Sequence, residues 1–386
     1  MGVYLFVIAL LIFFILKYDV GHKQRGKQQS QLIVLILLVL MSGLRYHIGA
    51  DSISYEADFK YGIPELSKLF SSNEMQSQPL WIFLMSFCKT LFGSFVAFQF
   101  LHAIILNLLI FRFIKKTTNY VFTALLFTFC VTWWNLSFEV LREALSVAIY
   151  INAILFLKEK EYFAYLSLGL VMMGLHWFSF LMVIITPFVM FVDKKIVYVS
   201  FIIGAIILFL FVDTQLLDLI NFISADSITG DASKRIDSYL NQEGGQGRVT
   251  YNLIGLLFTF ILYVVLPLIT IHYNNEVKVD KYFSKILMLF ILLAVLQTKL
   301  VIFARFYNYL YIIMIVCIVN VLYEKEIKVT LLKLMYNLLT LIFMLNGCVS
   351  FYRPSSNEYR HNINYNCYHI PYKTIFQDPD PIRESL

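Results

Sequence analysis

The segment Arg-Tyr-His-Ile-Gly-Ala-Asp-Ser-Ile-Ser-Tyr, residues 45–55, combines residue types that could bind and activate a phosphorylated sugar. Arg45 can offer paired hydrogen bonds to a phosphate, and Gly49 permits a tight turn or a positive φ. Asp51 can accept a proton or hydrogen-bond a sugar hydroxyl. The structural alternative is an arginine that reaches lipid headgroups beside an ordinary turn.

Three further candidates stand at the ends of apolar stretches. Arg142, near the start of one stretch, could hold an anion or could only pair with Glu139 three residues earlier. His176, in Gly-Leu-His-Trp-Phe-Ser, could act as a general base or contact a phosphate. It could equally be an ordinary hydrogen-bonding residue at the membrane interface. Arg305 opens another stretch and has the same two interpretations.

Two polar segments could complete a site. Residues 213–249 contain Gly-Gly-Gln-Gly and are long enough to form a lid, although no Gly-Lys-Ser/Thr motif of a nucleotide loop follows. The C-terminal tail, residues 350–386, is rich in Tyr, Asn and His. These side chains suit sugar stacking and hydroxyl recognition, whereas a disordered chain end is the alternative.

The composition predicts that apolar helices in a membrane position these residues. The chain has 386 residues, of which 59% are hydrophobic and 15% charged. Soluble domains usually contain about 25% charged residues. Apolar runs recur to about residue 350 without a linker rich in Pro, Gly or Ser. We therefore expect one polytopic transmembrane domain over residues 1–349, followed by an extracytoplasmic tail.

The apolar runs predict an all-α integral membrane protein with about twelve transmembrane helices, and a GT-C-like polytopic architecture is compatible with them. The candidate spans are residues 2–17, 31–44, 94–114, 119–137, 140–157, 160–175, 177–192, 196–212, 250–272, 283–300, 303–323 and 329–349. The apolar stretch 80–92 is too short for a normal crossing. We expect it to be a re-entrant or interfacial helix that ends at Gly93.

Positive charges predict the orientation of these spans. They cluster in alternate loops, at 17–27, 112–116, 158–160, 194–195, 278–285 and 325–333. The positive-inside rule places these loops in the cytoplasm, and hence loops 45–79 and 213–249 and the tail outside. With Arg45 outside and Arg112 inside, only one full crossing fits between them, so 80–92 is a half-span. A true crossing at 80–92 would instead put Arg112 outside.

Other kinds of site receive no support from the sequence. The five cysteines are scattered without a CxxC pair, which argues against a metal site or a disulfide framework. No nucleotide-binding or metalloprotease motif occurs, and we expect no cofactor. The net charge of +6 comes mainly from short loops and reflects topology, so no nucleic-acid partner is expected.

The motifs together resemble the EpsG family of exopolysaccharide polymerases, which are relatives in role of the Wzy polymerases. The resemblance covers nearly the whole chain in order. It includes the pattern R-Y-x-x-G-x-D-x-x-x-Y, the arginine in Leu-Arg-Glu-Ala-Leu, the Gly-x-His-x-x-Ser cluster, a late Arg-Phe-Tyr and a Pro-Tyr in the tail. The chain departs from the common family pattern at Glu143, where glutamine is usual, and in the residues that follow His176.

The resemblance implies a glycosyltransferase of the bacterial inner membrane that joins polyprenyl-diphosphate-linked oligosaccharides on the outer face. Its setting would be exopolysaccharide, capsule or O-antigen biosynthesis, with the lipid bilayer and other polysaccharide-assembly membrane proteins as partners. Arg142 and Arg305, together with Arg45 and Tyr55, are the predicted diphosphate- and substrate-binding residues, and Asp51 or His176 is the predicted base. The alternatives are a flippase for lipid-linked oligosaccharides and a membrane acyltransferase that modifies polysaccharide.

Overall fold

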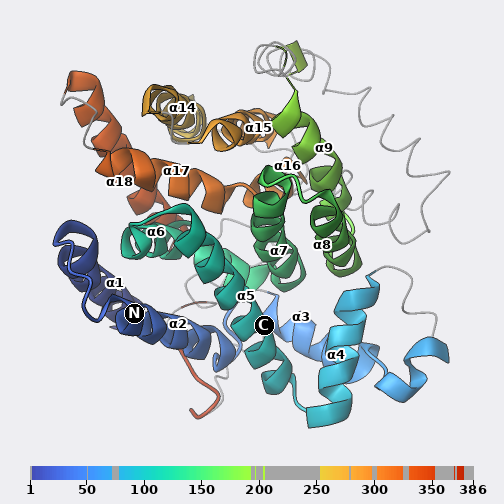
Figure 1. Cartoon of the computed structure of the whole chain (residues 1–386). Helices are drawn as coiled ribbons and strands as arrows, with labels where there is room; N and C mark the ends of the chain where they lie inside the picture. Colours follow the sequence, from blue (N-terminus) through green and yellow to red (C-terminus); the bar gives the residue numbers. More distant parts are fainter. Residues whose placement is uncertain are drawn as a thin grey trace. The chain divides into compact units, whose positions relative to one another are not determined.

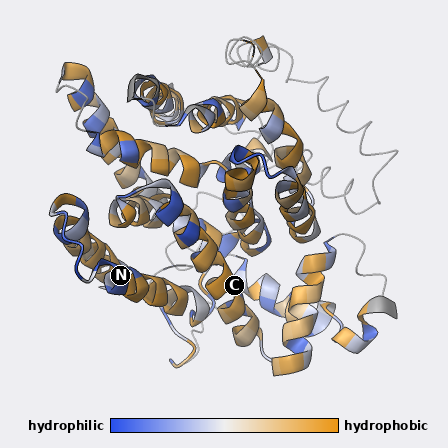
Figure 2. Cartoon of the chain, viewed as in Figure 1, coloured by the Kyte–Doolittle hydropathy of each residue, from blue (hydrophilic) through white to orange (hydrophobic). Residues whose placement is uncertain are grey.

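The computed structural model describes residues 2–49, 51–71, 78–192, 196, 203–204, 253–277, 280–297, 302–324, 330–352, 369 and 372–377. Within these ranges every regular element is a helix, apart from an isolated antiparallel bridge between Arg45 and Thr374 (Figure 1). The helices are mostly hydrophobic (Figure 2). The predicted all-α class is confirmed, and the predicted lid at 213–249 lies outside the described residues.

The chain divides into two compact units. Unit 1 comprises Met1–Ile184, Leu341–Ser355 and Ile363–Leu386, and unit 2 comprises Ile185–Thr340 and Ser356–Asn362. The helices of the first unit are α1 (Gly2–Phe14), η1 (Ile15–Val20), α2 (Lys27–Gly43), α3 (Ser52–Ala57), η2 (Asp58–Gly62), η3 (Leu66–Ser71), α4 (Pro79–Phe92), α5 (Phe95–Thr117), α6 (Val121–Thr128), η5 (Phe129–Trp133), η6 (Asn135–Glu139), α7 (Leu141–Lys158) and α8 (Tyr162–Leu175). Helix α9 (Ser179–Phe191) begins in unit 1 and ends in unit 2.

The core of unit 1 lies around α5 and α7. Helix α7 is buried on nearly every face, which suits a helix with apolar residues on all sides. Helix α2 packs along α5, and α8 packs along α7 (Figure 1). The end of η1 is fixed to α6 because the buried Asp19 carboxylate accepts hydrogen bonds from the backbone N–H (2.8 Å) and the hydroxyl (3.0 Å) of Thr123.

Unit 2 is built around one buried helix. Its described helices are α13 (Leu253–Phe260), η7 (Ile261–Val265), α14 (Leu266–Val277), α15 (Lys281–Gln297), α16 (Ile302–Asn308), α17 (Tyr311–Tyr323) and the first part of α18 (Leu331–Tyr352), whose remainder from Leu341 belongs to unit 1. Nearly all residues of α17 are buried, and α14 and α15 pack against it. The Lys285 ammonium donates to the Met190 carbonyl at 3.0 Å and so binds the end of α9.

Four of the described helices are long and apolar enough to cross a membrane: Gly2–Val20, Phe95–Thr117, Ile254–Asn274 and Leu331–Val349. Several shorter apolar helices accompany them. The chain is therefore a multi-pass membrane protein. Helix α4 ends at Phe92 and Gly93 adopts φ +61°, so the predicted helix end is confirmed. The predicted span 303–323 is divided, because the chain turns at Tyr309 and Leu310 between α16 and α17.

A close helix contact generates the first prediction. A Cβ atom at Gly43, at the end of α2, would lie 2.4 Å from the Phe100 ring of α5. We expect Gly43→Ala to lower the free energy of unfolding by about 1–3 kcal/mol, because the two helices would have to move apart. Gly2→Ala, where a Cβ meets nothing within 4 Å, is the matched control. Thermal unfolding in detergent measures both, and equal melting temperatures would contradict the prediction.

Candidate functional site

The Arg45 guanidinium lies inside unit 1 and not at its surface. The residue is 1% exposed. Its Nη1 donates to the Ser42 carbonyl, and its Nε donates to the Ile48 carbonyl at 3.3 Å. The guanidinium also lies 5.5 Å from the centre of the Phe138 ring. Burial lowers the pKa of Arg45 to about 10, so the side chain remains a cation at neutral pH.

Gly49 joins this loop to the segment that precedes α7. Its φ is +104°, and a Cβ atom there would lie 2.1 Å from the Phe138 carbonyl oxygen. Only glycine adopts this backbone while approaching another backbone so closely. The contact therefore fixes the loop after α2 against η6, immediately before Arg142.

Tyr55 and Arg142 meet at this junction. The Arg142 guanidinium lies 5.7 Å from the centre of the Tyr55 ring. Asp51, exposed at the N-cap position of α3, interacts electrostatically with Tyr55. Burial raises the pKa of Tyr55, and the Arg142 cation opposes that shift. The structure thus brings three of the predicted site residues together.

Arg142 itself is half-buried in the first turn of α7. Its Nη1 donates to the Gln78 side-chain carbonyl at 3.4 Å. Gln78 is the residue that precedes α4. The cation is consequently held between α3 and the start of α4, with part of its surface open.

His176 lies at the same end of unit 1 as Arg142. The Ser146 hydroxyl of α7 donates to the Met172 carbonyl of α8 at 2.9 Å, which places these residues at one level. The two helices are antiparallel neighbours, joined by a short turn. Arg142 precedes Ser146 by one turn and His176 follows Met172 by one turn, so both lie toward the same end. His176 is 6% exposed, and its ring contacts that of Phe178.

Arg305 belongs to the other unit. It is half-buried in the last turn of α16, directly before Phe306 and Tyr307. Its assignment to the diphosphate stays a prediction.

Several residues that hold the site were missed in the sequence because they lie within apolar spans. The α5 side chain of Gln99 donates to the carbonyls of Gly43 (2.8 Å) and Arg45 (2.9 Å). The His102 ring forms a hydrogen bond of 2.9 Å with the carbonyl of Leu141, the residue before Arg142. The spacing of these two residues on one face of α5 was the available signal.

The tail contributes a second missed set. The backbone N–H of Tyr46 donates to the Lys373 carbonyl at 3.0 Å, and that of Ile375 donates to the Leu44 carbonyl at 3.1 Å. The His369 ring is fully buried and forms a 2.7 Å hydrogen bond with the carboxylate of Glu139. The described part of the tail is therefore docked against the loop that carries Arg45.

Tyr372 strengthens this docking. Its hydroxyl donates to the Met41 carbonyl at 2.7 Å, and its ring meets that of Tyr4 edge to face at 5.9 Å. Burial raises the pKa of Tyr372 to about 12, so its hydroxyl stays protonated. Pro371, the other residue of the Pro-Tyr motif, lies outside the described residues.

A charged cluster lies at the surface of the same loop. The His47 Nε2 donates to the Glu56 carboxylate at 2.6 Å, and the Lys60 ammonium donates to its other oxygen at 2.8 Å. His47 has a φ of +43°, a left-handed backbone that non-glycine residues seldom adopt. Its hydrogen bond, followed by that of Lys60, lowers the pKa of Glu56 to about 2.

The Gly49 contact generates the second prediction. Gly49→Ala combines an unfavourable φ with a clash against backbone that cannot rotate away, so the loop must move off Phe138. We expect a loss of stability of about 2 kcal/mol or more and at least a tenfold loss of whatever activity depends on Arg142. Gly62→Ala is the control, because its Cβ would lie 4.0 Å from the nearest atom. Wild-type behaviour of Gly49→Ala in thermal unfolding would contradict the contact.

The Glu56 cluster generates a pH prediction. Its pKa falls from 4.5 to about 2 on folding, so its stabilisation is complete above about pH 4.5 and is lost as the pH falls toward 2. We expect the melting temperature of the wild type to fall more than that of Glu56→Gln between pH 6 and pH 3. Thermal unfolding in detergent at several pH values measures the difference. A constant gap between the two proteins would show that Glu56 titrates normally.

Comparison with known proteins identifies the family of the chain. No functionally curated protein and no solved structure gives a significant match. The model of the EpsG family matches residues 30–366, from within α2 to the tail, and so includes the loop after α2, the start of α7, His176 and α16. Since this match covers most of the chain, the protein belongs to the EpsG family.

Proposed function

We propose that the protein is a polysaccharide polymerase that joins polyprenyl-diphosphate-linked oligosaccharide units on the outer face of the bacterial inner membrane. Family membership implies a role in exopolysaccharide synthesis. The observation that carries the finer proposal is the partly open Arg142 cation, packed on Tyr55 beside the Asp51 carboxylate. A cation and a carboxylate at one helix end suit a diphosphate leaving group and a sugar hydroxyl, respectively.

In the proposed reaction the acceptor hydroxyl oxygen attacks the anomeric carbon of the donor sugar. The bond from that carbon to the phosphate oxygen breaks, and polyprenyl diphosphate leaves with the electron pair. Arg142 neutralises the charge that develops on the leaving group, and its hydrogen bond to Gln78 and its contact with the Tyr55 ring keep the guanidinium in place. Arg305, in unit 2, is kept as a predicted diphosphate-binding residue.

The proton of the acceptor hydroxyl passes to Asp51 or to His176. The exposure of Asp51 and its electrostatic coupling to Tyr55 support Asp51 as the base. His176 is the second candidate, since it lies toward the same helix end but is largely buried. Arg45 orients the loop through its hydrogen bonds to loop carbonyls, and it is assigned to the substrate phosphate through its remaining Nη2 donor.

The proposed topology has about twelve spans, with α4 as an interfacial or re-entrant helix. Helix α4 has 14 residues and is therefore about 21 Å long, against about 30 Å for the hydrocarbon core. Its first end lies at Gln78, which contacts Arg142. Near its other end, Lys89 donates to the carbonyls of Lys60 (2.9 Å) and Ile63 (2.6 Å) in the loop after α2. Both ends of α4 therefore contact residues that the topology places on the outer side, which supports an interfacial position for this helix.

The proposal predicts that Arg142 is essential for elongation. We expect Arg142→Ala to lower the elongation of purified lipid-linked repeat units by about 10²–10³-fold, as the loss of one transition-state donor does. Arg112→Ala is the matched control. Its guanidinium lies 5.6 Å from the Phe156 ring, much as that of Arg142 lies near the Tyr55 ring. Arg112 is near the C-terminal end of α5, whereas Gln99, which contacts the Arg45 loop, is near the start of that helix. We expect this variant to retain elongation within a few-fold.

Two outcomes would overturn the assignment. Equal losses in Arg142→Ala and Arg112→Ala would mean that Arg142 supports the fold and not the reaction. Absence of elongation by the wild type with its native repeat unit, while labelled lipid crosses proteoliposome membranes, would favour a flippase.

A further inference from the structure

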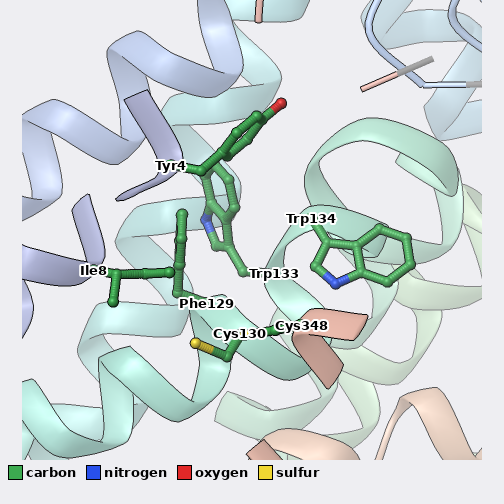
Figure 3. A pocket seen from close by; sticks show the side chains of 7 residues that line it. All are labelled: Tyr4, Ile8, Phe129, Cys130, Trp133, Trp134 and Cys348. Atoms are coloured by element: carbon green, nitrogen blue, oxygen red, sulfur yellow. The ribbon is translucent and has the colours of Figure 1, made fainter. Parts of the chain in front are cut away.

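An aromatic pocket lies in unit 1 beside the docked tail. It holds about 290 Å³ of empty space, including its open mouth. Its walls come from Tyr4 and Ile8 of α1, the consecutive residues Trp133 and Trp134, and Phe129. Figure 3 shows the side chains of Tyr4, Phe129 and Trp133 grouped together, with the Trp134 ring set apart from them. We call this feature the aromatic pocket.

The aromatic pocket opens between membrane helices. Two of its walls belong to span candidates: α1 lies within Gly2–Val20, and Cys348 lies within Leu331–Val349. None of the seven described residues that line it is charged. A site of this kind accepts hydrocarbon and excludes ions.

Polar groups border the aromatic pocket on one side. The Tyr4 hydroxyl donates to the His369 carbonyl at 2.8 Å, and the Trp134 ring lies 5.7 Å from that of His369. His369 in turn binds Glu139 at 2.7 Å. Two pocket walls therefore also support the residues that surround Arg45.

Arg45 supplies a positive charge at this border. Its guanidinium interacts electrostatically with Glu139 and Tyr4. The Nη2 atom is buried and has no hydrogen-bond partner, and a buried donor of this kind is costly to leave unsatisfied. An apolar pocket beside a cation with an unused donor is complementary to an amphiphile with an anionic head and a hydrocarbon tail.

We infer that the aromatic pocket binds the isoprene units nearest the phosphate of a polyprenyl-linked substrate. This inference rests on the proposed function and names the part of the lipid that the protein recognises. Prenyl chains carry flat, branched double bonds at regular intervals, and such groups stack on aromatic faces in a way that saturated acyl chains do not. Only a short segment of chain would lie against these rings, and the remainder of the lipid would stay in the bilayer.

The test uses a photoreactive farnesyl phosphate that carries a diazirine, added to the full-length protein in detergent. After irradiation, the modified residues are mapped by mass spectrometry. We expect labelling near Trp133 and Trp134 that undecaprenyl phosphate competes away and that an equal amount of saturated phosphatidic acid leaves in place.

A matched pair of variants on α1 tests whether the pocket itself is responsible. Ile8→Trp fills the pocket, whereas Ile12→Trp adds the same side chain one turn further along, where the residue is 44% exposed. We expect labelling to fall about tenfold or more in Ile8→Trp and to stay at the wild-type level in Ile12→Trp. Only the first variant removes apolar contact area between the prenyl chain and the pocket walls. Thermal unfolding shows whether Ile8→Trp folds, and Cys348→Phe fills the pocket from α18 if it does not.

The outcomes separate this inference from the proposed function. Equal labelling in the pocket-filling and control variants, or equal competition by phosphatidic acid, would overturn prenyl binding even if the wild type elongates polysaccharide. Labelling that follows the expected pattern in a protein that does not elongate would leave the prenyl site standing and remove the polymerase assignment.

Discussion

The contact between Gly49 and the Phe138 carbonyl determines how the site of unit 1 is assembled. The loop after α2 and the segment before α7 are far apart in the chain, and here their backbones meet at a distance that excludes a Cβ atom. On one side of this contact the loop continues into α3, which carries Tyr55. On the other side α7 begins with Arg142. The pairing of Tyr55 with Arg142 follows from this single approach of two backbones.

Around this contact, buried side chains satisfy backbone carbonyls that would otherwise lack partners. Gln99 donates to the Gly43 carbonyl at the end of α2, and His102 forms a hydrogen bond with the Leu141 carbonyl, just before Arg142. In an apolar interior each unpaired carbonyl is costly, so these hydrogen bonds restrict the loop more strongly than they would in water. The docked tail adds a bond of the same kind, because the Tyr372 hydroxyl donates to the Met41 carbonyl. The site is thus held by hydrogen bonds from side chains to backbone carbonyls, and not by ion pairs alone.

Three arginines of unit 1 share a second kind of contact. Arg45, Arg112 and Arg142 each lie over an aromatic ring, at 5.5, 5.6 and 5.7 Å from its centre. A ring face stabilises a guanidinium while leaving its in-plane donors available to other groups. Arg45 directs two of its donors to loop carbonyls, whereas Arg142 remains partly open. Burial therefore distinguishes the largely enclosed Arg45 from the partly open Arg142, although the sequence motifs treat them alike.

The sequence by itself determined the class of the protein. Its apolar runs indicated the membrane helices, Gly93 marked the end of α4, and the ordered motifs indicated the EpsG family. These features are local or depend on the order of motifs, and periodicity and hydropathy report them directly.

Only the tertiary structure decided which candidates meet. It buried Arg45, placed Arg142 on Tyr55 and joined Glu139 to His369, 230 positions away. It also gave structural roles to Gln99 and His102, which look like isolated polar residues within an apolar span. The physical reason is that burial and pairing depend on how helices distant in sequence pack together, and no local pattern of residues encodes that packing.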